Sequence, residues 1–73
     1  MKSLAYKEAK YIAEFRVNRL HVSEPESRCV EIAEKLAGLA RLTRKQTASL
    51  VASACKVHEA NRRTYRAVMS GML

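Results

Sequence analysis

The sequence predicts a mainly α-helical single domain, spanning residues 1–73, with one short strand. Three observations lead to this prediction. Only two Gly and one Pro occur in the 73 residues, so little interrupts helical segments. Capping-box patterns, which mark helix N-termini, begin at Ser23 and at Thr43. Just before Ser23, apolar and polar residues alternate, as they do in a half-buried strand.

The first expected element is an N-terminal helix within residues 1–14. Its segment KSLAYKEAKYIAE is rich in Ala, Lys and Glu, and this composition predicts a helix. We interpret the aromatic side chains of Tyr6, Tyr11 and Phe15 as packing residues rather than as platforms on which unpaired bases stack.

A short strand is expected at about residues 16–22. In the segment RVNRLHV, Leu20 and Val22 alternate with Arg19 and His21, which gives the period of two that is typical of a strand. The alternative is that the first helix continues to Val22. The chain would then be an all-α three-helix domain, with apolar positions around more than half of its first helix.

The next helix is expected at about residues 24–40. Ser23 and Glu26 have the spacing of a capping box, and Pro25 is tolerated in a first helical turn. Apolar residues then recur at helical spacing. They are Cys29, Ile32, Ala33, Leu36 and Ala40.

A long second helix is expected at about residues 43–70. Thr43 and Gln46 form its capping-box pattern, and Gly71 would end it. Its apolar stripe consists of Leu50, Val51, Ala54, Val57, Tyr65, Val68 and Met69. The polar residues His58 and Asn61 fall on the same stripe. A helix of this length is expected to project beyond a compact core or to pack against another chain.

The charge balance favours a polyanionic partner. The net charge is +7, and residues 44–73 carry six basic residues against one acidic residue. Residues 23–43 instead carry three basic and four acidic residues. Basic charge of this size is typical of proteins that bind nucleic acid. The middle segment is therefore interpreted as structural and the basic flanks as docking sites for an anion.

Size and cysteine content predict a homodimer in the cytoplasm. A single domain of this size buries only roughly 60% of its unfolded surface, and association is one remedy. Two cysteines are too few for a disulfide scaffold. No run reaches the roughly 18 apolar residues of a membrane span, and no signal peptide is visible. No membrane partner is therefore expected.

Neither a metal, a cofactor nor an enzymatic activity is expected. Cys55 and His58 lie three residues apart on a helix, but a structural zinc needs four ligands and only Cys29 and His21 remain to complete the set. No arrangement typical of a catalytic triad or of a phosphate-binding glycine loop is present. The chain is also too small to enclose a large substrate pocket.

Three stretches of sequence carry a family resemblance. They read RVNRLHVSEP from residue 16, VEIAEKL from residue 30 and LTRKQTASL from residue 42. Their order of strand, capped helix, connection and capped helix resembles the ribbon-helix-helix family of DNA-binding proteins, of the Arc, MetJ and CopG type. The second helix also looks like that of plasmid-conjugation members. The resemblance covers about residues 15–61 and leaves residues 62–73 as a C-terminal helix extension.

The resemblance implies that two paired strands enter the major groove of double-stranded DNA. The implied base-reading residues are Val17, Arg19 and His21. The start of the second helix would bind phosphate, because backbone N–H groups at a helix N-terminus attract anions. The phosphate-binding residues there would be Thr43, Arg44 and Lys45. Asn18 departs from the pattern, since it falls on the inward face of the strand.

The resemblance further implies a transcriptional repressor or an accessory protein of plasmid or phage DNA processing. A different class of function is a small helical module that docks on a larger protein partner, as a phage-type inhibitor or a complex subunit does. RNA binding by a helical hairpin is a third hypothesis. Strand content separates the first two, because a chain without a strand cannot form the ribbon.

Overall fold

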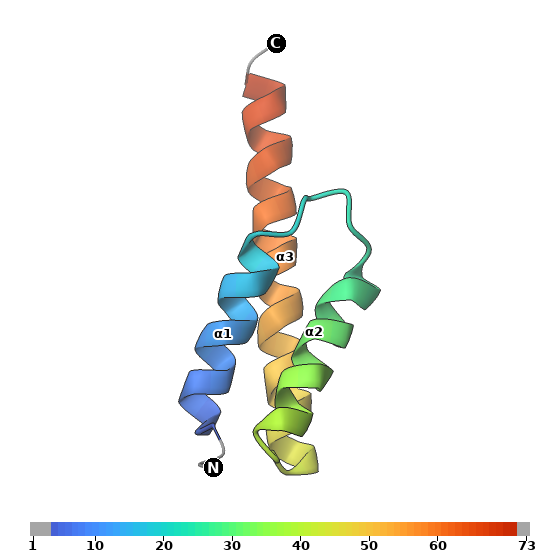
Figure 1. Cartoon of the computed structure of the whole chain (residues 1–73). Helices are drawn as coiled ribbons and strands as arrows, with labels where there is room; N and C mark the ends of the chain where they lie inside the picture. Colours follow the sequence, from blue (N-terminus) through green and yellow to red (C-terminus); the bar gives the residue numbers. More distant parts are fainter. Residues whose placement is uncertain (1–3, 72–73) are drawn as a thin grey trace.

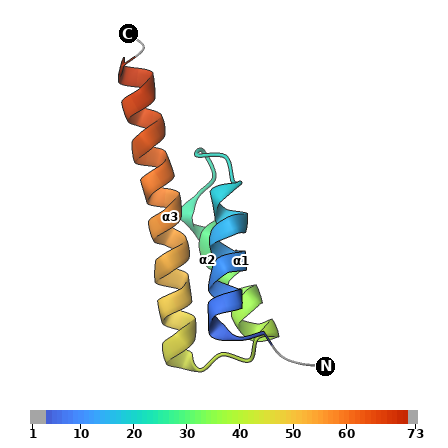
Figure 2. The ribbon, with the colours of Figure 1, turned by 90° about the vertical axis from the view of Figure 1, so that its left-hand side faces the viewer.

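The computed structural model describes residues 4–71 as three helices packed side by side (Figure 1). They are α1 (Tyr6–Asn18), α2 (Glu26–Leu39) and α3 (Arg44–Gly71). Helices α1 and α3 run in the same direction, and α2 runs antiparallel to both. Helix α3 extends well beyond the other two (Figure 2), so the molecule measures 51 × 18 × 15 Å.

The predicted strand at about residues 16–22 is wrong, and the ribbon-helix-helix fold is wrong with it. Within residues 4–71 there is no strand, whereas Val17 and Asn18 belong to the last turn of α1. The all-α three-helix alternative fits the structure. Helix α1 continues because its buried face repeats every four residues, at Ala9, Ala13 and Val17.

The long helix was predicted correctly from its capping box. The prediction was about residues 43–70, and α3 spans Arg44–Gly71. The N–H of Gln46 donates to Thr43 Oγ1 at 3.1 Å, and the N–H of Thr43 donates to Gln46 Oε1 at 3.0 Å. Both halves of the capping box are therefore formed, which satisfies backbone donors that the helix leaves open.

Helix α2 was also predicted, but its capping was not. The helix begins at Glu26 and its N-cap is Pro25, with no side-chain hydrogen bond to the cap. The Ser23 hydroxyl lies 2.7 Å from His21 Nδ1 instead. The Ser23 hydroxyl is therefore engaged within the α1–α2 loop and does not cap α2.

The core is built from small side chains. Its buried residues are Ala9, Ala13, Val17, Cys29, Ala33, Leu36, Ala37, Ala40, Leu50, Ala54 and His58. The many alanines allow the helix backbones to approach closely, and they leave little apolar area to bury. The core ends at His58 on α3, and every residue from Arg62 to Gly71 is exposed. The last three turns of α3 therefore project from the bundle.

Two polar contacts fix α1 against α3. The hydroxyl of Tyr6 donates to Ser49 Oγ at 2.8 Å, near the start of both helices. At the other end of α1, Asn61 Nδ2 donates to Asn18 Oδ1, also at 2.8 Å. Each pair is separated by 43 residues, so the two helices run parallel without a shift between the contacts.

The turn between α2 and α3 contains a residue in a left-handed conformation. Arg41 has φ 53°, a region that favours glycine. The N–H of Leu42 donates to the Ala37 carbonyl, and the N–H of Arg41 donates to the Gly38 carbonyl. This is a Schellman motif, in which two carbonyl groups at the end of a helix gain partners.

Candidate nucleic-acid interface

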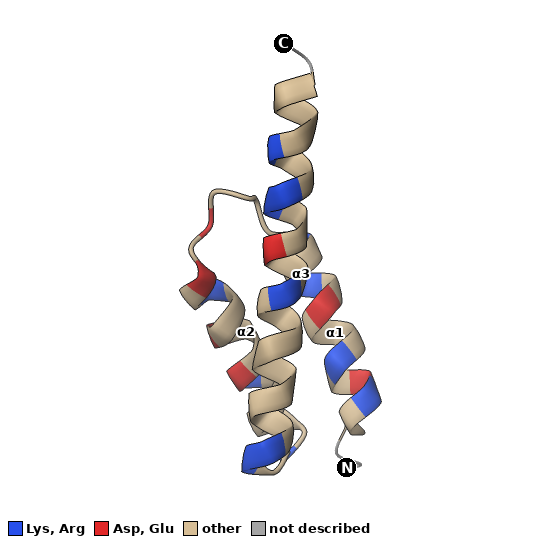
Figure 3. Cartoon of the chain, turned by 180° about the vertical axis from the view of Figure 1, so that it is seen from behind, with Lys and Arg blue, Asp and Glu red and all other residues tan. Residues whose placement is uncertain are grey.

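The solvent side of α3 is strongly basic along almost the whole helix. Six basic residues lie on α3: Arg44, Lys45, Lys56, Arg62, Arg63 and Arg66. All six are exposed, and at 3.6 residues per turn they fall within an arc of about 120°. The buried residues Leu50, Ala54 and His58 fall on the other side of the helix. We call this surface the basic face of α3. Figure 3, which views the molecule from the side opposite to Figure 1, shows basic residues in blue at intervals along α3.

Little negative charge offsets the basic face. Glu59 is the one acidic residue of α3, and its Oε1 lies 2.9 Å from Arg63 Nη2. Both side chains are about two-thirds exposed or more, so this ion pair contributes little to the stability of the fold and breaks readily when Arg63 meets another anion. The other five basic residues of the face make no ion pair with any described residue.

A buried histidine ties the α1–α2 loop to α3. His58 is 2% exposed, and its Nε2 lies 2.7 Å from the Glu24 carbonyl oxygen. A carbonyl only accepts, so Nε2 carries the proton of the neutral ring. The Nδ1 atom is buried and has no partner among the described residues. The loop is thus held against α3 at the level where the core ends.

Two hollows adjoin this junction between the loop and α3, and Arg62 and Arg66 line both. The first, of about 310 Å³, is also lined by the acidic residues Glu26 and Glu59. The second, of about 320 Å³, lies between the loop and the projecting part of α3. Its lining consists of His21, Val22, Ser23, Arg62, Tyr65 and Arg66, and we call it the loop cleft.

The cysteine thiols beside the first hollow are held in their protonated form. Burial raises the pKa of Cys55 to about 11, assisted by the neighbouring Glu26 carboxylate as hydrogen-bond partner and as negative charge. Burial and Glu26 raise the pKa of Cys29 as well. A protonated thiol is a weak nucleophile and a poor metal ligand. Within residues 4–71, no three His, Cys, Asp or Glu side chains are grouped to hold a metal ion.

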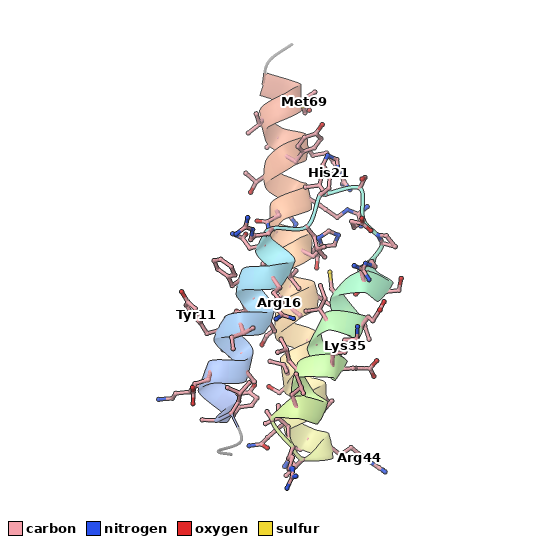
Figure 4. The ribbon with its side chains drawn as sticks, viewed as in Figure 1. Tyr11, Arg16, His21, Lys35, Arg44 and Met69 are labelled. Carbon is pink, nitrogen blue, oxygen red and sulfur yellow. The ribbon has the colours of Figure 1, made fainter. Side chains whose placement is uncertain are left out.

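The three predicted base-reading residues do not share one surface. Val17 is fully buried, so a ligand cannot touch it while α1 is packed. Arg19 lies directly after α1, with its guanidinium 5.6 Å from the ring centre of Phe15. His21 lies in the loop, beside the projecting part of α3 (Figure 4), and lines the loop cleft.

The predicted phosphate-binding residues lie together at the start of α3. Thr43 uses its hydroxyl for the capping box, whereas Arg44 and Lys45 are exposed and form one end of the basic face. Phosphate binding there stays a prediction. Sequence reasoning missed Lys56 as a member of the same face. Its spacing of 11 residues from Lys45, about three turns, is the signal that would have included it.

Comparisons with family models, with curated protein sequences and with solved structures find no match to this chain. Of the helices described, none is both long and apolar enough to cross a bilayer.

Proposed function

We propose that this protein binds double-stranded DNA through the basic face of α3. The observation that carries the proposal is the placement of six basic residues on the one side of α3 that α1 and α2 leave uncovered. From Arg44 to Arg66 this face is about 33 Å long, close to one turn of duplex DNA. The net charge of +7 supports the same class of partner.

A helix can approach DNA along this face without disturbing the bundle. The core residues of α3 point away from the basic face, and its last turns project clear of α1 and α2. The major groove is wide enough for one α-helix. Arg and Lys along the face would contact phosphates, which gives affinity that depends on salt. A repressor role was implied only by the ribbon, which the described residues do not form.

The test compares two triple variants by the anisotropy of a labelled duplex. Lys45→Gln, Lys56→Gln and Arg63→Gln remove three charges from the basic face. Each lost phosphate contact should lower the slope of log affinity against log salt by about 0.9, so the triple variant loses up to about 2.7.

The matched control removes three charges elsewhere, by Lys7→Gln, Arg16→Gln and Lys35→Gln on α1 and α2. These side chains are exposed, so both variants should fold. The control should keep nearly the wild-type slope. Equal losses in the two variants would show that net charge, and not the basic face, governs binding. Absence of duplex binding at low salt would overturn the proposal.

An exposed apolar patch favours a second candidate function, docking on another protein chain. Tyr65, Val68 and Met69 are 48%, 54% and 47% exposed on the projecting part of α3. Their spacing continues the stripe that α1 and α2 cover lower on the helix. A second copy or a larger partner would cover the patch. Sedimentation of the wild type and of Val68→Ser distinguishes self-association from a monomer.

A further inference from the structure

The loop cleft joins the α1–α2 loop to the projecting part of α3. Its volume of about 320 Å³ falls at the low end of the range for ligand pockets, roughly 300 to 1,000 Å³. The Glu24–His58 hydrogen bond holds the loop in place next to the cleft, because it ties Glu24, the residue after Ser23, to a buried side chain of α3. The cleft is therefore a hollow between two elements that the fold holds together.

Two arginines on one wall give the cleft a positive charge. Arg62 and Arg66 are four residues apart on α3, so their side chains lie on the same side of the helix. Neither makes an ion pair with a described residue, whereas Arg63 is paired with Glu59. None of the described residues that line the loop cleft carries a carboxylate. The wall thus offers two guanidinium groups to an anion.

The opposite wall contributes a further donor from His21. The backbone N–H of Ser23 donates to His21 Nδ1 at 3.1 Å, and the Ser23 hydroxyl lies 2.7 Å from the same atom. A backbone N–H only donates, so Nδ1 accepts and the neutral ring carries its proton on Nε2. Ser23 therefore fixes the tautomer in which Nε2–H is available to a ligand oxygen.

Apolar groups complete the cleft next to these donors. Tyr65 is half exposed and Val22 is half buried, and both line the same hollow. A guanidinium group can donate two parallel hydrogen bonds to the oxygens of one phosphate, and an aromatic ring can stack against a nucleobase. A phosphate attached to a flat ring is the ligand that uses both kinds of group.

We propose that the loop cleft binds one nucleoside monophosphate unit. Its phosphate contacts Arg62, Arg66 and His21, and its base packs against Tyr65. The unit is either a free nucleotide or an unpaired nucleotide at the end of a DNA strand. Binding of an unpaired nucleotide at the end of a DNA strand rests on the proposed function, because Arg62 and Arg66 also belong to the basic face of α3.

A titration followed by amide NMR of the full chain tests the site. Deoxyadenosine monophosphate is the ligand, and inorganic phosphate and deoxyadenosine are the two half-ligands. The nucleotide should shift the amide signals of His21, Ser23 and Tyr65 and should bind more tightly than either half. Tyr65→Leu should weaken it by about fivefold or more, as expected for the loss of one stacked base.

The arginine wall has a matched control on the same helix. Arg62→Gln with Arg66→Gln should abolish nucleotide binding, whereas Arg44→Gln with Lys45→Gln, at the far end of α3, should leave it unchanged. If both pairs of substitutions weakened nucleotide binding equally, the proposal would be overturned. The net charge of the protein, and not the loop cleft, would then determine nucleotide affinity.

Duplexes with and without a single-stranded overhang separate this site from the proposed function. His21→Gln and Tyr65→Leu lie outside the basic face, so they should weaken the overhang duplex and spare the blunt one. Suppose that the protein binds both duplexes equally and that the nucleotide shifts no amide signals. This result would overturn the proposed nucleotide site in the loop cleft and would leave the proposed duplex binding by the basic face intact. Nucleotide binding without duplex binding would support the cleft for free nucleotides and overturn the proposed function.

Discussion

The side-chain amide of Asn61 donates a hydrogen bond across 2.8 Å to the side-chain oxygen of Asn18, the last residue of α1. One helical turn earlier on α3, His58 bonds the Glu24 carbonyl of the α1–α2 loop. Both α3 residues interrupt an apolar stripe. Their partners show why: they lie where α1 ends and the loop begins, so backbone and amide groups there need polar partners.

The first prediction concerns the coupling of these two asparagines. Asn18→Ala and Asn61→Ala should each lower the free energy of unfolding by about 0.5 to 1 kcal/mol, because each removes a hydrogen bond between α1 and α3 that water only partly replaces. The double variant should lose less than the sum of the two. Chemical denaturation of all four proteins measures the cycle. Losses that add to within about 0.5 kcal/mol would show that the pair is not coupled.

Local sequence signals explain why α2 and α3 could be predicted. The Thr43 capping box and the helical spacing of Cys29, Ala33 and Leu36 act within a few residues, and the structure contains both. The end of α1 depends on packing instead. Val17 continues a buried face that only contact with the other helices reveals, and the alternation from Arg19 to Val22 was too short to outweigh it.

Asn18 was the signal against the ribbon. On a strand it would have pointed into an apolar core, which contradicts the pattern, whereas on a helix it meets Asn61. The sequence predicted the basic face only in part, as a phosphate site at Thr43, Arg44 and Lys45 and as an excess of basic residues over residues 44–73. The loop cleft could not be predicted, because His21 and Tyr65 are brought together by the fold and share no local pattern.

The second prediction concerns the buried anchor of the loop. His58→Ala should lower the free energy of unfolding by about 2 to 4 kcal/mol, because it leaves a cavity and removes the partner of the Glu24 carbonyl. It should also speed amide exchange in the loop. His21→Ala is the control, since that ring is exposed and the expected change is within about 0.5 kcal/mol. Similar losses in both variants would contradict the role of His58 as anchor.

The third prediction concerns the turn after α2. Arg41 has φ 53°, which costs an ordinary residue about 1 kcal/mol, so Arg41→Gly should raise the free energy of unfolding by about 0.5 to 1 kcal/mol. Arg41→Ala removes the same charge but keeps the strained backbone, and it should change stability little. Thermal denaturation compares the two. An equal gain in Arg41→Ala would attribute the effect to charge instead.

The fourth prediction concerns Gly38, the second-last residue of α2. A Cβ at this position meets nothing within 4 Å, so Gly38→Ala adds helix propensity without a clash. The full propensity difference between Gly and Ala is that of a helix interior, and Gly38 lies in the last turn, so the expected gain is about 0.5 kcal/mol. Gly71→Ala is the control: its Cβ is equally unobstructed, but it lies at the end of α3, where the gain should be smaller. A loss of stability in Gly38→Ala would contradict the open space at this position.

The fifth prediction follows from the pKa of Cys55, which burial and Glu26 raise to about 11. The folded state favours the thiol. This preference therefore contributes fully to the free energy of unfolding at any pH below the pKa of the Cys55 thiol in the unfolded chain. The contribution is lost as the pH rises from that value towards about 11. In a Cys29→Ala background, which leaves one thiol, alkylation should be slow at neutral pH and should accelerate at alkaline pH. Cys29 is itself a minor cause of the shift, so the pKa of Cys55 in this background should lie somewhat below the wild-type value.

Glu26→Gln tests the cause of this shift. Removal of the carboxylate charge should lower the pKa of Cys55, so the pH profile of alkylation moves to lower pH. Glu31→Gln, on the same helix but absent from the groups that shift Cys55, should leave the profile in place. Because burial is the largest cause, the Glu26→Gln profile should still lie above that of an unfolded thiol. A return to the ordinary value would show that charge, and not burial, protonates Cys55.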